Sequence, residues 1–109
     1  MSEPGDDDLE GFEEEYDEHR EALFDLITDY AEENEVDDAF LTGLLLDLAV
    51  TLRMMLYANS MEKPSSSGLK LELDRFLKDA GDHVREVKKG ADEFIADIKA
   101  AREADSEAQ

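Results

Sequence analysis

The sequence predicts an all-α protein, in which three antiparallel helices form a bundle that pairs into a homodimeric helical bundle. Three observations favour this class. Residues 40–58 are an almost unbroken apolar run, and residues 73–101 repeat apolar side chains at spacings of four and three. Residues 9–30 do the same with one interruption. Such spacings place side chains on one face of a helix, so we expect residues 1–109 to form a single helical domain.

The first predicted helix covers residues 7–33, after a loose N-terminus at residues 1–6. Asp7 or Asp8 is a good N-cap, since a short side-chain oxygen can accept a free backbone N–H there. His19 is the one polar residue in the apolar seam of this helix. The seam consists of Leu9, Phe12, Tyr16, Leu23, Leu26 or Ile27, and Tyr30. Acidic residues surround it, so the exposed face is expected to be anionic.

The second predicted helix covers residues 37–59. Asn34 and Glu35 are expected to make the turn before it, with Asp37 or Asp38 as its N-cap. One half of its helical wheel is crowded with apolar side chains: Leu41, Leu44, Leu45, Leu48, Leu52, Met55 and Leu56. The other half also carries apolar residues, and a helix that is apolar around most of its circumference requires cover on most sides. We therefore expect it to be the central helix.

The third predicted helix covers residues 70–103, between a loop at 60–68 and a frayed tail at 104–109. The loop contains Pro64, three serines and Gly68, which break regular structure. The alternation of leucines in residues 69–73 is also compatible with a short strand. The unbroken spacing of four and three that follows favours a helix.

This third helix overhangs the other two by about ten residues at 1.5 Å per residue. Phe94, Ile95 and Ile98 lie near the overhang and require cover. Two alternatives remain open from the sequence: a bend at Gly81 or Gly90, or a second subunit that covers the end. Twofold symmetry is the default for such a dimer.

Acidic residues dominate the charge, which is −20 for 109 residues. Residues 1–62 contain 20 Asp and Glu against two basic residues, Arg20 and Arg53. Repulsion of this size loosens a small domain in dilute buffer. In 1 M salt the Debye length falls to about 3 Å, so the repulsion is screened. An acidic coat on a periodically patterned chain therefore indicates a packed protein in a salt-rich cytoplasm rather than a disordered tail.

The chain has no cysteine, nearly equal Asp and Glu, few lysines in its first half, and the runs DDD and EEE. In these features it resembles the small uncharacterised acidic all-helical proteins of halophilic archaea. The resemblance extends over the whole chain and is one of composition, so it implies a halophilic cytoplasm but no activity and no site residues.

A cytoplasmic location is also expected, both from the acidic N-terminus and from the charged residues within the apolar run at 40–58. The N-terminus is acidic, where an export signal needs positive charge and then an apolar run. Asp47 and Arg53 interrupt the run at 40–58, so we expect no membrane-spanning helix.

The two histidines are weak candidates for chemistry. His19 is expected to be a boundary residue shielded by Tyr16, and the alternative is a metal ligand together with Glu15 and a carboxylate from another helix. The Glu-x-x-His pairing of di-iron bundles is absent because Tyr16 occupies the glutamate position. His83 is expected to make a local ion pair with an acidic neighbour one turn away, at Asp79 or Glu86.

Paired carboxylates give an alternative function. Glu15-x-x-Glu18 and Glu35-x-x-Asp38 resemble the pattern with which all-α nucleoside triphosphate pyrophosphohydrolases bind Mg²⁺. Nearly half of residues 1–38 are acidic, however, so such a match is expected by chance. The second pair also falls in the predicted turn, with no basic residue nearby to hold phosphate.

The third predicted helix carries a basic band that consists of Arg75, Lys78, Arg85, Lys88 and Lys89. Acidic residues interleave with it, so nucleic acid is not an expected partner. Pairing with the acidic face of the first helix, within or between subunits, is the simpler hypothesis. Met54, Met55 and Met61 are expected in the core; at the surface they would favour a different protein as partner.

These patterns contain no convincing set of catalytic, cofactor-binding or metal-binding residues, and we expect no cofactor. The prediction is a non-enzymatic assembly or adaptor protein that acts through helix–helix association as a homodimer. The alternative is the Mg²⁺-dependent pyrophosphohydrolase.

Overall fold

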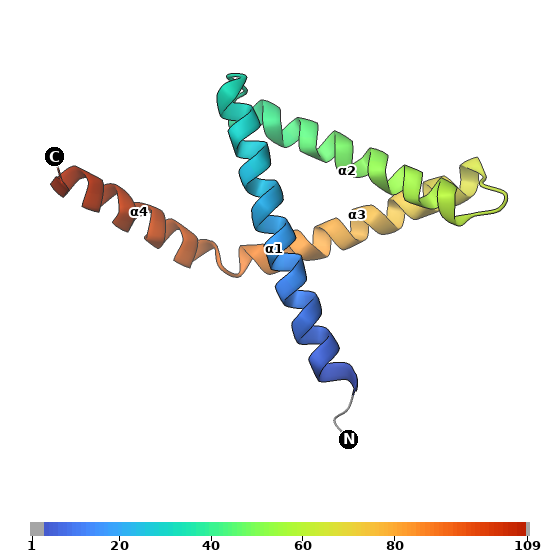
Figure 1. Ribbon diagram of the computed structural model, residues 1–109. Helices are drawn as coiled ribbons and strands as arrows, with labels where there is room; N and C mark the ends of the chain where they lie inside the picture. Colours follow the sequence, from blue (N-terminus) through green and yellow to red (C-terminus); the bar gives the residue numbers. More distant parts are fainter. Residues whose placement is uncertain (1–3, 109) are drawn as a thin grey trace. The chain divides into compact units, whose positions relative to one another are not determined.

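The computed structural model describes residues 4–108, with side chains for residues 10–107. The described chain forms four helices and no strand, so the prediction of an all-α fold is confirmed (Figure 1). The helices are α1 (Pro4–Glu33), α2 (Asp38–Ser60), α3 (Ser66–Lys88) and α4 (Ala91–Ala108). The chain divides into two compact units, one up to Leu48 and one from Ala49, and this boundary falls inside α2.

Helix α1 begins three residues before the expected start at residue 7. Its first residue is Pro4, which suits a helix start because the first backbone N–H groups need no partner within the helix and proline has none. Of the segment expected to be loose, residues 1–3 lie outside the described residues, and residues 4–6 are helical.

The turn after α1 lies where the sequence predicts it, and it closes the helix with a Schellman motif. The Val36 N–H donates to the Ala31 carbonyl at 2.8 Å, and the Glu35 N–H donates to the Glu32 carbonyl at 3.4 Å. Glu35 has a φ of 55°, the left-handed conformation that this motif requires. Ala31 is 7% exposed and is the one buried residue among the described side chains.

Asp37, rather than Asp38, caps α2. Its Oδ1 accepts the Phe40 N–H at 2.8 Å, and its carbonyl accepts the Leu41 N–H at 2.9 Å. The half-buried residues of the first unit all lie near this turn: Ile27, Thr28, Val36 and Leu41. Among the described side chains, packing between α1 and the start of α2 is therefore confined to the turn, and residues 10–26 of α1 are exposed.

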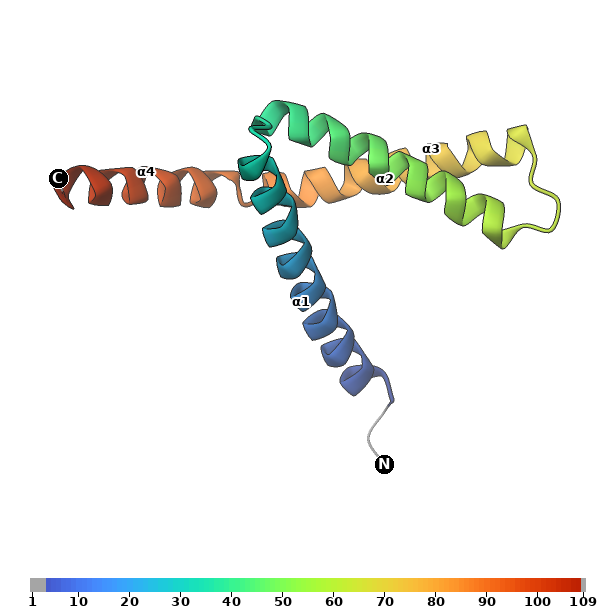
Figure 2. The same ribbon diagram turned by 45° about the horizontal axis from the view of Figure 1, so that its top comes forward.

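In the second unit, the end of α2 and the start of α3 form an antiparallel hairpin (Figure 2). Helix α3 begins at Ser66, inside the segment expected to be a loop. Ser65 has an extended backbone, and its Oγ accepts the Gly68 N–H at 3.1 Å, which makes it an N-cap. The serines expected to break the structure thus start a helix. Residues 69–73 belong to α3, so the strand alternative for them is wrong.

The segment expected to be one helix over residues 70–103 forms two, because the ladder is interrupted near Gly90. The Lys89 and Gly90 N–H groups donate three residues back, to Glu86 and Val87, at 3.2 and 3.0 Å. Glycine disfavours a helix interior. Basic residues end α3 and acidic residues begin α4, which suits the dipoles of two shorter helices. Of the predicted bends, the structure has the one at Gly90. The tail expected to fray is helical to Ala108.

Candidate functional site

The most prominent surface of the described chain is one apolar side of α2, which we call the leucine face. It consists of Leu41, Leu44, Leu45, Leu48, Leu52, Met55 and Leu56. At 100° per residue these seven side chains fall within about 120° of the helical wheel. No charged residue lies among them. The face belongs to one continuous helix, so its geometry does not depend on how the two units are placed.

Apart from Leu41, which is half-buried at the turn, the leucine face is exposed to solvent. Leu48, Leu52 and Met55 are 56%, 65% and 54% exposed, and none of the described residues of α2 is buried. Single exposed leucines are ordinary on protein surfaces, whereas a contiguous apolar patch marks a surface of association. The expectation that this helix needs cover on most sides follows from the sequence, and Leu48 and Leu52 are more than half exposed.

The opposite side of α2 packs against α3. Val50, Arg53 and Tyr57 are half-buried and lie about 140° to 200° around the helix from Leu48. On α3 the half-buried residues repeat at helical spacing: Leu69, Glu72, Leu73, Phe76 and Ala80. The hairpin therefore uses one side of α2 and leaves the leucine face free.

An ion pair fixes the hairpin near its middle. Arg53 Nη2 lies 2.5 Å from Glu72 Oε1, and these side chains are 31% and 20% exposed. Arg75 Nη1 approaches the other carboxylate oxygen of Glu72 at 3.7 Å. Glu72 thus binds one cation from each helix, which sets the register of α2 against α3.

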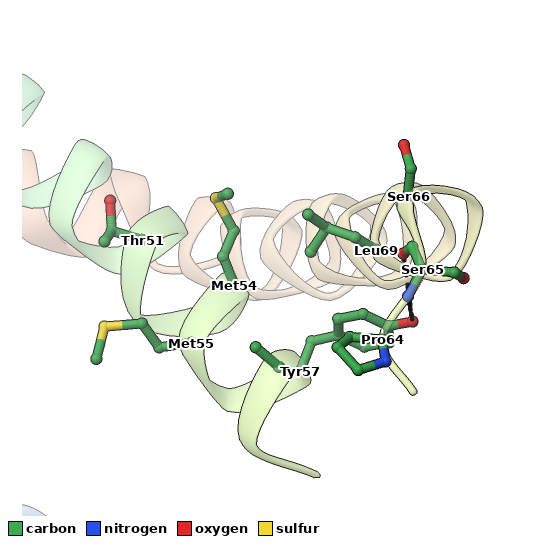
Figure 3. Close-up of a pocket in the computed structure, with 9 residues that line it drawn as sticks. Thr51, Met54, Met55, Tyr57, Pro64, Ser65, Ser66 and Leu69 are labelled. Carbon is green, nitrogen blue, oxygen red and sulfur yellow. Dashed lines mark hydrogen bonds between the residues drawn. The ribbon is translucent and has the colours of Figure 1, made fainter. Parts of the chain in front are cut away.

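Tyr57 fastens the loop end of the hairpin, where α2 leads into α3 (Figure 3). Its hydroxyl accepts the Ser65 N–H at 3.2 Å and lies 3.4 Å from the Ser65 carbonyl, to which it can donate. The ring fits because residue 68 is glycine: a Cβ there would overlap the Tyr57 hydroxyl and lie 3.0 Å from Ser65 Oγ. Gly68 is therefore a site of close approach rather than only a breaker of structure.

An open groove of about 540 Å³ runs along the hairpin beside this contact (Figure 3). Its lining is Thr51, Met54, Met55, Tyr57, Ala58, Pro64, Ser65, Ser66 and Leu69. This lining includes no carboxylate and no histidine, so it has no general acid–base pair. Met54, Met55 and Met61 are 38%, 54% and 48% exposed. The methionines expected in the core are therefore at the surface, the case that favours association with a partner.

The histidines do not form a site within the described residues. His19 Nε2 lies 3.7 Å from Glu15 Oε1, and both side chains are 73% exposed. This is a surface pair on one helix, with no third ligand near it. For His83, the described contacts include no ion pair with Asp79 or Glu86, and Glu86 instead binds Lys89 at 2.9 Å.

The acidic pairs proposed as a magnesium site are not brought together. Fifteen residues of helix, about 22 Å, separate Glu18 from the end of α1 at Glu33. Glu35 and Asp38 lie beyond that end, so the four carboxylates cannot share one ion. Across the described residues, no three acidic, histidine or cysteine side chains are placed to hold a metal.

The basic band of α3 is largely engaged within the helix. Arg75 pairs with Glu72, Arg85 with Asp82, and Lys89 with Glu86, each three residues away. Such local pairs stabilise a helix by about 0.2–0.5 kcal/mol each. Next to this band the apolar stripe continues uncovered, since Leu77, Val84 and Val87 are 71%, 51% and 61% exposed.

Comparisons with protein-family models, with curated proteins and with solved structures find no match. By length and composition alone, α2 could also cross a membrane: an 18-residue stretch of it has a mean hydropathy of 1.7, and none of that stretch is buried. The core helix of a soluble protein satisfies the same criterion when a partner covers it. The positions of the charged residues on α2 bear on whether this helix meets a membrane or a protein partner.

Proposed function

We propose that the protein is a non-enzymatic assembly or adaptor protein that acts through helix–helix association, as a homodimer in a salt-rich cytoplasm. The observation that carries this proposal is the exposed leucine face of α2. The antiparallel bundle expected from the sequence, paired into a dimer, belongs to the same proposal. In it, the bundle is completed only when a second copy covers the leucine face.

The energetics of burial support a partner. The exposed fractions of Leu44, Leu45 and Leu56 are 39%, 36% and 54%. Added to the exposed fractions of Leu48, Leu52 and Met55, these fractions correspond to the surface of about three whole apolar side chains per copy. Burying them in two copies contributes roughly 9–18 kcal/mol at 1.5–3 kcal/mol per side chain. Association costs about 4–15 kcal/mol in lost freedom, so the gain is of the same size as the cost and its upper part exceeds it.

The charge distribution supports association in a salt-rich cytoplasm. The described part of α1 from Glu10 to Glu33 contains Arg20 as its one basic residue among many acidic ones. Two copies that carry such helices repel one another in dilute buffer, whereas a salt-rich cytoplasm screens them. The association surface is therefore expected to work where salt is high.

The experiment is to place a charge on the leucine face and measure mass in 2 M KCl by light scattering after gel filtration. Leu48→Glu should convert the dimer to a monomer, because a carboxylate would be buried without a partner. Leu46→Glu is the matched control. Leu46 is 62% exposed and lies about 160° around α2 from Leu48, outside the face.

The proposal fails if the wild-type protein is a compact monomer in 2 M KCl, or if both variants shift the mass equally. Helical content by circular dichroism distinguishes loss of assembly from loss of folding. Capture of proteins from a high-salt lysate by the intact dimer would then identify what it assembles with.

A further inference from the structure

We infer that two copies pair through α2 in an antiparallel manner, with the twofold axis passing beside Leu48. This inference rests on the proposed function, since it specifies the geometry of the association proposed there. It names the partner as a second copy of this chain and the surface as the leucine face.

The leucine face has an internal symmetry that fits such a pair. Its central row is Leu41, Leu45, Leu48, Leu52 and Met55, at spacings of four, three, four and three. Counted from Leu48, the row has a leucine three positions before and another four positions after, and an apolar residue seven positions away on each side. In an antiparallel pair centred there, Leu41 meets Met55 of the other copy, Leu45 meets Leu52, and Leu48 meets itself. A twofold axis requires this self-complementarity.

The position of α3 leaves room for the second copy. Arg53 and Tyr57 hold α3 on the side of α2 opposite Leu48. A second α2 can therefore approach without displacing the hairpin. Two hairpins joined in this way make a four-helix arrangement with both copies of α2 at its centre.

Charge selects the antiparallel orientation. The segment from Glu32 to Asp38, at the end of α1 and the start of α2, contains five acidic residues and no basic one. A parallel pair would bring the two acidic segments together at one end. An antiparallel pair places them at opposite ends, each beside the other copy's segment 59–68, in which Glu62 and Lys63 leave no net charge. It also sets the two helix dipoles in opposite directions, which is favourable.

A membrane is a poorer occupant of this surface than a second copy. Arg53 and Asp47 lie on α2, and Arg53 is bound to Glu72. Inserting α2 would either break that ion pair or take the charged helix α3 into the lipid. A second α2 requires neither, because the leucine face itself carries no charge.

Cysteine cross-linking tests the orientation directly, because the natural sequence contains no cysteine. Leu48→Cys, Leu41→Cys and Met55→Cys are oxidised separately in 2 M KCl, and Leu41→Cys is also oxidised after mixing with Met55→Cys. Leu48→Cys should form a disulfide-linked dimer. Leu41→Cys alone and Met55→Cys alone should not, since the two equivalent sites lie about 21 Å apart along the helix. The mixture should cross-link.

Self-cross-linking of both Leu41→Cys and Met55→Cys would overturn the inference in favour of parallel pairing. Dimers by mass that cross-link at none of the three sites would place the interface elsewhere, which overturns this inference and leaves the proposed dimer standing. A monomer by mass would overturn the proposed function itself. Flotation of the wild-type protein with phosphatidylcholine vesicles in 2 M KCl would assign α2 to a lipid surface and overturn the pairing.

Discussion

Gly68 shows how a single residue determines the closure of the hairpin. Because it lacks a Cβ, the Tyr57 hydroxyl can reach the backbone of Ser65. Gly68→Ala should displace the ring and lower the free energy of unfolding by about 1–2 kcal/mol through the lost hydrogen bonds. Thermal and urea unfolding in 2 M KCl measure this change.

Gly81→Ala is the matched control for Gly68→Ala. A Cβ at Gly81 meets nothing within 4 Å, and this glycine lies in the interior of α3. Alanine there should therefore stabilise the protein by about 1 kcal/mol. Equal effects of the two substitutions would contradict the role given to the Tyr57 contact.

Glu35 is a second residue whose backbone conformation has a measurable cost. Its φ of 55° is unfavourable for any residue with a Cβ. Glu35→Gly should raise the free energy of unfolding by about 1 kcal/mol. Glu32→Gly removes the same charge within α1 and should instead lower the stability by about 1 kcal/mol. Stabilisation by both substitutions would indicate relief of charge repulsion rather than of backbone strain.

At the scale of elements, the interruption between α3 and α4 depends on Gly90. A Cβ at Gly90 would lie 3.7 Å from the Val87 carbonyl, which is an ordinary contact. Gly90→Ala should therefore be tolerated and should join the two helices. It should stabilise the helical conformation at residue 90 by about 1 kcal/mol, and the helical content should rise. Circular dichroism measures the helicity.

Spin labels at Ala80→Cys and Ala101→Cys test the same joining by distance. A continuous helix places these positions about 31 Å apart, so Gly90→Ala should narrow the distribution around that value. An unchanged distribution would mean that the charges at this junction, and not Gly90, interrupt the helix.

The sequence predicts the elements better than their ends. Periodic apolar residues are sufficient to predict α1 and α2 and the turn at Asn34 and Glu35, because apolar side chains recur at helical spacing in both segments and polar residues separate them. The start of α3 differs from the prediction because Ser65 acts as a cap, a role that depends on one hydrogen bond to Gly68. The ladder break at Gly90 is among the predicted alternatives, and the change from basic to acidic residues there is the signal that could have selected it.

The candidate surface is also partly predictable. Apolar content alone indicates that residues 40–58 need cover, and the leucine face is visible on a helical wheel. Which side α3 takes is not visible, since it depends on the Arg53–Glu72 pair between segments distant in sequence. The carboxylate pairs failed as a site because sequence spacing does not measure distance along a helix that ends between them.

For the whole molecule, the charge of −20 opposes association until salt screens it. The dimer fraction should rise steeply between 0.1 and 2 M KCl, as the Debye length falls from about 10 Å to below about 3 Å. Sedimentation velocity measures the fraction. Sucrose is the control, because it favours burial without screening charge. An equal rise in sucrose alone would indicate that repulsion is not what limits association.

In the proposed dimer, a second copy covers the leucine face of α2. Sedimentation equilibrium of the wild-type protein in 2 M KCl, over a concentration series, tests it most directly. We expect a mass of twice the 12.3 kDa of one chain. A single species of 12.3 kDa throughout the series would contradict it.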